Sequence, residues 1–451
     1  MRILVIGINY APEKTSVAPF TTGLCEHLAS EGHSVTVVTA FPYYPEWRVW
    51  DGYRGMLYRR ERINGVEVHR VAHYVPRKPS RLVERLLYDF SFTLAAFVAA
   101  LFTGKCDVIY CSSPPPTVGL AAYLLGKIKR SPYAIKLTDL ASDAALATGI
   151  LKEGFVVRAA RAFEGFIYRK ACAVVCLCQG FIDRLRERGA DAGKLRLISD
   201  WGDTEHVRPV ESDGAFRKAH DFSAKQFLVL HAGNMGKKQN LGNVVKAAEY
   251  SQGETDLAWA LVGEGEERAA LEAEIAQRTL SNIRVLPFEP PESLPQLYAA
   301  ADLLLLNQAA AVEDAVIPSK LLAYMAAGRA IVAAVSENSE AAQLVRQASC
   351  GIIVRPENPG ALVDAALMLR GAPATRRLLA ANGRAYVEKH FTKRSVLAAY
   401  DEFFLNVLCA PETAPAPDEA PSEDWTAADS PSFAPPQRDA VQVRSLASTR
   451  K

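Results

Sequence analysis

Short apolar runs recur along this chain, and segments with helical spacing separate them. This alternation is typical of buried parallel strands packed between helices. The first series of runs predicts strands at residues 3–6, 34–39, 107–111, 134–138, 173–178 and 195–198. A helix is predicted at 17–31 and ends at Gly32, because glycine tolerates the left-handed backbone that often closes a helix.

A second series of runs repeats the same alternation further along the chain. It predicts strands at residues 227–231, 257–262, 283–286, 303–306, 330–335 and 351–354. Two such series predict an α/β fold of two Rossmann-like, doubly wound domains that face a cleft. The pattern is interrupted near 200–212, so we expect the domains to span residues 1–205 and 206–410. Ligands of these sheets bind beyond the carboxyl ends of the strands.

Residues 411–451 differ in composition from the rest of the chain. They contain seven of the 26 prolines and show little apolar periodicity. Such a segment cannot bury enough apolar surface to offset the entropy of ordering it. We therefore predict a disordered C-terminal tail.

Composition and charge narrow the class of protein. The chain has 451 residues, 49% hydrophobic and 23% charged, which excludes a wholly disordered or coiled-coil chain. The net charge of +2 gives no case for a nucleic-acid partner. The charge is uneven, however, at +7 for residues 1–205, −2 for 206–410 and −3 for 411–451. The basic half fits either an anionic surface or substrate, or a solvated basic face.

Cysteine usage and the N-terminus favour a cytoplasmic protein. Cys172, Cys176 and Cys178 lie in an apolar run without a nearby histidine, which predicts buried thiols and no metal site. Reduced thiols fit the cytoplasm. The apolar stretch at residues 3–6 lacks the length and the cleavage site of a signal peptide.

Residues 90–103 form a 14-residue segment without a charge. A helix needs about 20 apolar residues to span a bilayer, so this one is too short. One interpretation is a buried helix between two strands. The other is a peripheral membrane contact through residues 77–103, at the inner face of the cytoplasmic membrane. In that interpretation the following side chains meet anionic lipid head groups: Arg77, Lys78, Arg81 and Arg85.

The most informative motif is at residues 231–241, where a predicted strand ends in a loop with glycines and two lysines. Gly233, Asn234 and Gly236 are small enough to let a diphosphate approach the backbone, and Lys238 supplies positive charge. A solvated turn is the alternative. Gly263 lies in a Gly-x-Gly sequence after the next strand, which fits a donor contact or only a tight turn.

A further motif occupies residues 313–328. Pro318 suits the first turn of a helix, whose free N–H groups could hold a phosphate together with Ser319. Lys320 could neutralise the phosphate. Glu313 and Asp314 lie just upstream, where they could accept hydrogen bonds from sugar hydroxyls.

Taken together, these motifs resemble the retaining GT-B glycosyltransferases of family four. The run at residues 10–13 and the run at 31–39 extend the resemblance to about residues 1–405. Runs at 42–45, 233–239 and 314–320 resemble bacterial exopolysaccharide enzymes of the colanic-acid fucosyl- and fucosaminyltransferase type. The resemblance implies a UDP- or GDP-linked sugar as donor, transfer with retention of configuration, and no cofactor or obligatory metal.

The resemblance also implies roles for individual residues. The donor would bind in the second domain, at Gly233, Asn234, Gly236, Lys238, Gly263, Pro318, Ser319 and Lys320. A lipid-linked or saccharide acceptor would bind in the first, at Tyr10, Pro12, Thr15 and Ser16. The catalytic candidates are Asp139, Lys238, Glu313 and Asp314.

Two departures from the family pattern bear on the activity. The usual pair of glutamates is absent, and its second position falls on Ala323. No histidine follows the strand at 134–138, where Asp139 is the candidate polar group near the sugar. Despite these departures, the resemblance predicts a glycosyltransferase of exopolysaccharide, O-antigen or capsule synthesis. Two alternatives stay open: a GT-B sugar-nucleotide epimerase, and a catalytically impaired glycan-assembly protein.

Overall fold

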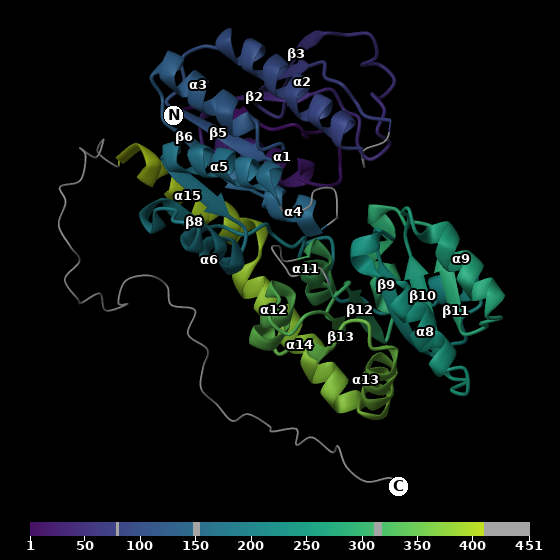
Figure 1. The fold of residues 1–451 in the computed structure, drawn as a ribbon. Helices are drawn as coiled ribbons and strands as arrows, with labels where there is room; N and C mark the ends of the chain where they lie inside the picture. Colours follow the sequence, from purple (N-terminus) through teal and green to yellow (C-terminus); the bar gives the residue numbers. More distant parts are fainter. Residues whose placement is uncertain (78–80, 148–153, 311–317, 410–451) are drawn as a thin grey trace. The chain divides into compact units, whose positions relative to one another are not determined.

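The computed structural model describes residues 1–77, 81–147, 154–310 and 318–409, and the predicted tail lies outside them. Two sheets form the framework (Figure 1). The strands of the first sheet are β1 (Arg2–Ile6), β2 (Ser34–Ala40), β3 (Tyr58–Ile63), β4 (Val66–Val71), β5 (Val108–Ser113), β6 (Tyr133–Leu137), β7 (Ala173–Cys176) and β8 (Leu195–Leu197). Those of the second are β9 (Phe227–Ala232), β10 (Leu257–Val262), β11 (Ile283–Leu286), β12 (Leu303–Asn307), β13 (Ile331–Ala334) and β14 (Gly351–Val354).

The strand orders confirm two doubly wound sheets. The first sheet has the order β3-β4-β2-β1-β5-β6-β7-β8, and only the pair β3 and β4 is antiparallel. The second has the order β11-β10-β9-β12-β13-β14 and is parallel throughout. The winding direction reverses between β1 and β5 and again between β9 and β12. Loops diverge at such reversals, which makes the carboxyl ends of these strands the expected ligand site.

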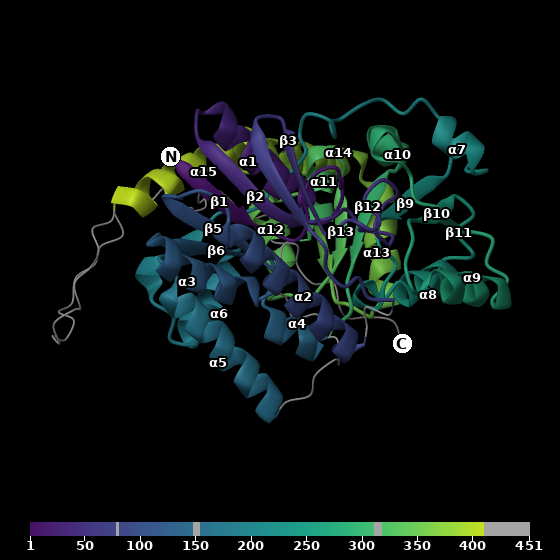
Figure 2. The ribbon, with the colours of Figure 1, turned by 90° about the horizontal axis from the view of Figure 1, so that it is seen from above.

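Helices cover both faces of each sheet, and Figure 2 shows α2, α3 and α5 on one face of the first sheet with α1 and α15 on the other. In the first half the helices are α1 (Ala18–Ser30), α2 (Leu82–Leu101), α3 (Val118–Lys129), α4 (Ala141–Ala147), α5 (Phe155–Lys170) and α6 (Gln179–Glu187). In the second half they are α7 (Ala215–Ala219), α8 (Gly242–Tyr250), α9 (Arg268–Gln277), α10 (Leu294–Ala300), α11 (Ser319–Ala326), α12 (Glu340–Ala348), α13 (Pro359–Gly371), α14 (Pro373–His390) and α15 (Lys393–Cys409). Short 3₁₀ turns are η1 (Ala192–Lys194), η2 (Lys237–Gln239) and η3 (Pro291–Ser293).

Each predicted strand is present, with bounds that differ by at most two residues, and Gly32 closes α1 with a positive φ of 84°. The prediction missed β3 and β4. The strand β3 is a largely exposed edge strand rich in arginine, so it has no apolar run. In β4 the polar Arg70 is fully buried, because its guanidinium donates to the Glu61 carboxylate and to backbone carbonyl oxygens.

The last helix, α15, packs on the first sheet, although the sequence-based division placed it with the second domain. Its apolar side chains share one core with β1 and α1 of the first domain: Val396, Leu397, Tyr400, Phe403 and Phe404. Beneath it, Lys136 of β6 donates from Nζ to Oδ1 of Asp200 at 2.5 Å and lies 5.9 Å from the centre of the Tyr400 ring. The Tyr110 hydroxyl donates to the Tyr400 hydroxyl at 3.1 Å. The C-terminal end of the fold is thus anchored to its N-terminal sheet.

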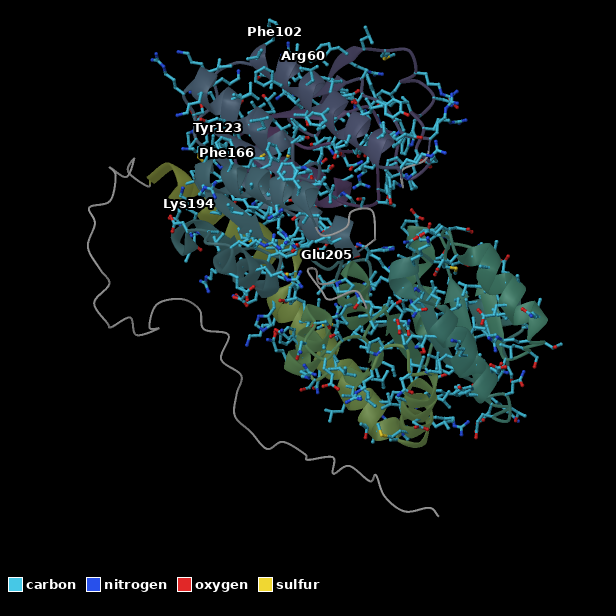
Figure 3. The ribbon with its side chains drawn as sticks, viewed as in Figure 1. Arg60, Phe102, Tyr123, Phe166, Lys194 and Glu205 are labelled. Carbon is cyan, nitrogen blue, oxygen red and sulfur yellow. The ribbon has the colours of Figure 1, made fainter. Side chains whose placement is uncertain are left out.

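Helix α2 contains most of the uncharged segment at 90–103, and its two sides differ in burial; the membrane contact stays a prediction. One side packs into the core through Tyr88, Phe92, Ala96 and Ala100. The other side exposes a row of apolar side chains, which we call the α2 stripe: Val83, Leu87, Phe90, Leu94, Val98 and Phe102. Phe102 is 85% exposed and projects away from the sheet (Figure 3). Within the described ranges, no helix is both long and apolar enough to cross a bilayer.

The three clustered cysteines differ in exposure. Cys176 and Cys178 are buried, and burial raises the pKa of each thiol to about 12. Cys172 is exposed, so the prediction of a buried thiol is wrong for this residue. No group of three or more His, Cys, Asp or Glu side chains in the described part of the chain is placed to hold a metal ion.

Candidate functional site

A cavity of about 560 Å³ lies at the carboxyl ends of the strands and takes its walls from both halves of the chain. One wall is the loop after β1, with Thr15 and Ser16, and another is the segment after β8 that carries Glu205 (Figure 3). The loop after β9 contributes Gly233, and the start of α11 contributes Ser319 and Lys320. The structure therefore brings together five residues that the sequence singled out.

The Lys320 ammonium is held over the end of β9 by His231. Lys320 Nζ lies 3.1 Å from His231 Nε2, while His231 Nδ1 lies 3.1 Å from the carbonyl oxygen of Leu305. An ammonium can only donate, so Nε2 must accept and Nδ1 must carry the proton. Burial and the neighbouring lysine charge both lower the pKa of His231, which agrees with a neutral ring. The histidine fixes one N–H of Lys320, and the carbonyl oxygen of Asn234 accepts a second, which leaves the third for a ligand.

Two glycines let Lys320 lie close to the loop backbone. Gly233 has a φ of 127°, and a Cβ atom there would be 2.3 Å from Cε of Lys320. Gly263 has a φ of 150°, and a Cβ atom there would be 1.9 Å from the carbonyl oxygen of Gly233. L-residues rarely adopt such backbone angles; a side chain at 233 would displace Lys320, and one at 263 would collide with the backbone. Gly263 thus lets its strand end pack closely against the loop after β9.

The other predicted residues of this loop lie around the same lysine. The carbonyl oxygen of Asn234 accepts a hydrogen bond from Lys320 Nζ at 3.4 Å. The N–H of Gly236 donates to the side chain of Gln239 at 3.2 Å and opens the turn η2. Pro318 is the residue immediately before α11, where its fixed φ of −62° positions the first helical turn. The helix therefore begins at Ser319, one residue after Pro318, whereas the prediction placed Pro318 in its first turn.

Lys238 and Asp139 influence each other electrostatically although they follow strands of different sheets. Lys238 lies exposed in η2, and its carbonyl oxygen accepts the N–H of Ala309 at 2.9 Å. Asp139 follows β6, where burial raises the pKa of its carboxyl group and the positive charge of Lys238 opposes that rise. Neither residue is among those that line the cavity. The charge of Lys238 thus acts on Asp139, and a catalytic role of either residue stays a prediction.

The predicted acceptor residues divide into two groups. Thr15 and Ser16 line the cavity, and Thr15 Oγ1 is buried without a hydrogen-bond partner in the described part of the chain. Tyr10 is buried in the core of the first domain, and Pro12 is exposed outside the cavity lining. The structure therefore offers Thr15 and Ser16 to a ligand in the cavity, while an acceptor contact by Tyr10 or Pro12 stays a prediction.

Glu313 and Asp314 lie outside the described residues, so their predicted roles stay predictions. Ala323, at the position of the missing family glutamate, lines the cavity with a methyl group. Other carboxylates line the same cavity and were not predicted: Asp203, Glu205 and Glu289. These side chains can accept hydrogen bonds from hydroxyl groups of a ligand.

Aromatic side chains also line the cavity, and the sequence analysis did not find them: Phe20, Trp201, Phe288 and Tyr298. Trp201 packs edge-on against Phe20, with the ring centres 5.1 Å apart. In the sequence, the only signal was the interruption of the strand pattern near 200–212, which we used to place the domain boundary. Aromatic rings provide faces on which a planar base can stack.

Binding of a nucleoside diphosphate to this cavity should weaken above pH 8. Burial lowers the pKa of Lys320 to about 8, so the free protein loses the ammonium charge as the pH rises through that value. The dissociation constant for UDP should then increase by up to about tenfold per pH unit. Titration of wild type and Lys320→Arg between about pH 7 and 9 checks this, because arginine stays charged throughout that range. A pH-independent constant in wild type would contradict the prediction.

Comparisons with known proteins match a different family description to each half of the chain. Residues 15–201 match the family described as Glycosyl transferase 4-like domain, and residues 212–386 match Glycosyl transferases group 1. The chain is 32% identical over 409 residues to the putative colanic acid biosynthesis glycosyl transferase WcaI of Escherichia coli K12 and covers 98% of it with 89% of its own length.

Solved structures share the fold. Sucrose-phosphate synthase from Thermosynechococcus elongatus superposes with a TM-score of 0.71 at 19% identity, over 91% of this chain and 100% of that one. Anabaena HepE in complex with UDP superposes with a TM-score of 0.66 at 18% identity, over 90% of this chain and 100% of HepE. At these identities the likeness concerns the arrangement of the two sheets and their helices.

Proposed function

Because the chain belongs to the GT-B glycosyltransferases of family four, we propose that it transfers a sugar from a nucleotide-sugar donor to a lipid-linked saccharide. The configuration of the sugar would be retained, and the nucleoside diphosphate would leave. The process would be the synthesis of an exopolysaccharide or lipopolysaccharide, as the name of WcaI suggests. The observation that carries the proposal is the single cavity in which Thr15 and Ser16 meet Ser319 and Lys320. Retention requires the acceptor to attack from the face that the diphosphate leaves, so both must reach one cavity.

The donor diphosphate would bind at the first turn of α11 and the loop after β9. One N–H group of Lys320 remains for its oxygens, and Ser319 and the backbone N–H groups of the first helical turn can donate as well. As the glycosidic bond breaks, negative charge develops on the diphosphate, and Lys320 stabilises it without a metal ion. Asp139 and Lys238 would contact the sugar, together with the predicted pair Glu313 and Asp314.

The nucleoside would occupy the aromatic part of the cavity. Phe288 offers a ring face to the base, and Glu205 or Glu289 can accept from the ribose hydroxyls in place of the family glutamate that Ala323 replaces. The complex of HepE with UDP supports a uridine nucleotide, and GDP-linked donors are the alternative.

The experiment is incubation of the purified protein with labelled UDP- and GDP-sugars and lipid-linked saccharides. Transfer of the label to the lipid supports the proposal if the new glycosidic bond has the same anomeric configuration as the donor. NMR of the product reads this configuration. An isomerised free donor would indicate the epimerase alternative. Binding of a donor without transfer to any of the acceptors would indicate a catalytically impaired glycan-assembly protein.

The α2 stripe would hold the enzyme against a bilayer that contains anionic phospholipids. The stripe is exposed and apolar along the whole length of α2, and Arg77 and Arg81 lie exposed before its first turn. Buried apolar area and lysine or arginine charge together bind amphipathic helices to anionic membranes. A lipid-linked acceptor supplies the reason, because its sugar stays at the membrane surface.

Vesicle sedimentation tests this contact. Wild type should sediment with phosphatidylglycerol vesicles, and Leu94→Glu with Phe102→Glu should reduce the bound fraction at least about tenfold, since two apolar side chains are lost from the interface. Both positions are exposed, so the fold should persist. Leu378→Glu is the matched control, because Leu378 is 60% exposed on α14 of the second domain. Equal sedimentation of all three proteins, or none by wild type at low salt, would refute the contact.

A further inference from the structure

A second cavity, of about 650 Å³, lies in the second domain and shares no lining residue with the first. Helix α14 forms one side, and the turn between α11 and β13 forms another. Its charged lining consists of Arg329, Arg376, Arg377, Arg384, Asp302 and Glu388. We call it the arginine cavity. Four guanidinium groups thus face two carboxylates.

The two carboxylates compensate the charge of the four arginines only in part. Asp302 accepts from Arg217 at 2.8 Å and from the N–H of Leu228 at 3.0 Å, and its nearest approach to Arg376 is 3.9 Å. Glu388 pairs with Arg384 one helical turn away at 2.6 Å. Arg377 forms no hydrogen bond or ion pair with any residue in the described ranges.

Arg329 carries the least compensated charge. Its hydrogen bond is to the carbonyl oxygen of Ala299, at 2.9 Å, and no carboxylate contacts it in the described part of the chain. Burial lowers its pKa, and the nearby charges of Arg217 and Arg376 lower it further against the opposing effect of Asp302. A bound anion would relieve this repulsion.

Two of the arginines are fixed in place before any ligand arrives. Arg376 donates to the carbonyl oxygen of Leu369 at 2.8 Å, and its guanidinium lies 5.0 Å from the centre of the Phe227 ring. Arg384 donates to the carbonyl oxygens of Val207 at 3.0 Å, Ala326 at 2.7 Å and Thr204 at 3.1 Å and to the Glu388 carboxylate, which engages all its N–H groups, so it contributes charge to the cavity and no free donor. Arg376 is held through one N–H group, so its guanidinium can still present paired N–H donors, which match the oxygens of a phosphate.

We propose that the arginine cavity is a second anion site, which binds a small phosphate-bearing molecule independently of the donor. The excess of guanidinium groups selects an anion of more than one charge, and the volume admits a molecule larger than phosphate alone. The site is separate from the sugar-transfer chemistry, so it stands even if the proposed donor or acceptor is wrong.

Calorimetric titration of the full chain with pyrophosphate tests the proposal. Wild type should show two saturable steps, one at each cavity, and Lys320→Ala should retain only the step of the arginine cavity. In the Lys320→Ala background, Arg377→Ala should weaken that remaining step at least tenfold. Arg377 is exposed and unpartnered among the described residues, so this change should leave the fold intact, which an unchanged melting temperature verifies. Arg329→Ala is the second variant and should have the same effect.

Arg355→Ala in the same background is the matched control, since it removes one positive charge from a side chain that is 80% exposed. It should leave the remaining step unchanged. No saturable step in Lys320→Ala, or equal weakening by Arg355→Ala and Arg377→Ala, would overturn the proposal. Competition by phosphatidylglycerol vesicles would also overturn it, because it would assign the site to a lipid head group.

Discussion

Replacement of Lys320 by alanine is expected to lower kcat/KM for sugar transfer by about 10²–10³-fold. The reason is the geometry around its ammonium group. His231 and the carbonyl oxygen of Asn234 hold Nζ over the loop after β9, so the charge is in place before the diphosphate leaves. A preorganised donor to a developing negative charge contributes about 3–4 kcal/mol to stabilisation of the transition state. Initial rates with a saturating acceptor and varied donor measure the effect.

Lys246→Ala is the control for the loss of one positive charge, because Lys246 is exposed on α8 and does not line the cavity. Its kinetics should equal those of wild type. Lys320→Arg should retain more activity than Lys320→Ala, since it preserves the charge but not the fit beside Gly233. Wild-type kinetics in Lys320→Ala would remove this lysine from the site.

Replacement of Asp200 by alanine should destabilise the protein by about 3–5 kcal/mol, because it leaves the Lys136 ammonium buried and unpaired. Lys136 is only 8% exposed and lies between Asp200 and the ring of Tyr400. Burial alone would lower its pKa, but Asp200 and Tyr400 more than offset this and raise it. The midpoint of urea unfolding, followed by tryptophan fluorescence, measures the loss.

Asp107→Ala is the matched control, because Asp107 pairs with Arg2 at the surface, at 2.5 Å. Exposed pairs contribute about 0–1 kcal/mol, so this variant should unfold close to wild type. The double variant Asp200→Leu with Lys136→Met should recover much of the lost stability, since it removes both buried charges. Equal midpoints for Asp200→Ala and Asp107→Ala would show that the buried pair contributes no more than the surface pair.

The sequence predicted the central strands well because each is buried on both faces and therefore apolar along its length. The two strands it missed, β3 and β4, are not apolar along their length. β3 lies at an edge and faces solvent, so it has no apolar run to detect. β4 buries Arg70, which is possible only because Glu61 and the carbonyl oxygens of Ala11 and Ala40 satisfy it. Ala11 and Ala40 lie far from Arg70 in the sequence, so no local window reveals them.

The site was predictable where it lies in loops directly after strands. Gly233, Ser319 and Lys320 were found in this way and line one cavity. His231 was missed because it reads as an interior strand residue, and its role appears only when Lys320, 89 positions away, packs against it. Trp201 and Glu205 were missed because they belong to the connection between the sheets, where neither strand nor helix periodicity gives a signal.

The packing of α15 on the first sheet has a consequence for how the chain matures during synthesis. The strands of the first sheet leave the ribosome about 200 residues before Tyr400 and Phe404, which cover one of its faces. At about 5–20 residues per second, this corresponds to roughly 10–40 s. Throughout that interval the apolar side chains that α15 will contact lack their final cover. The first domain is therefore the first to be made and the last to be completed, and a chain that stalls before residue 404 presents an open, aggregation-prone face.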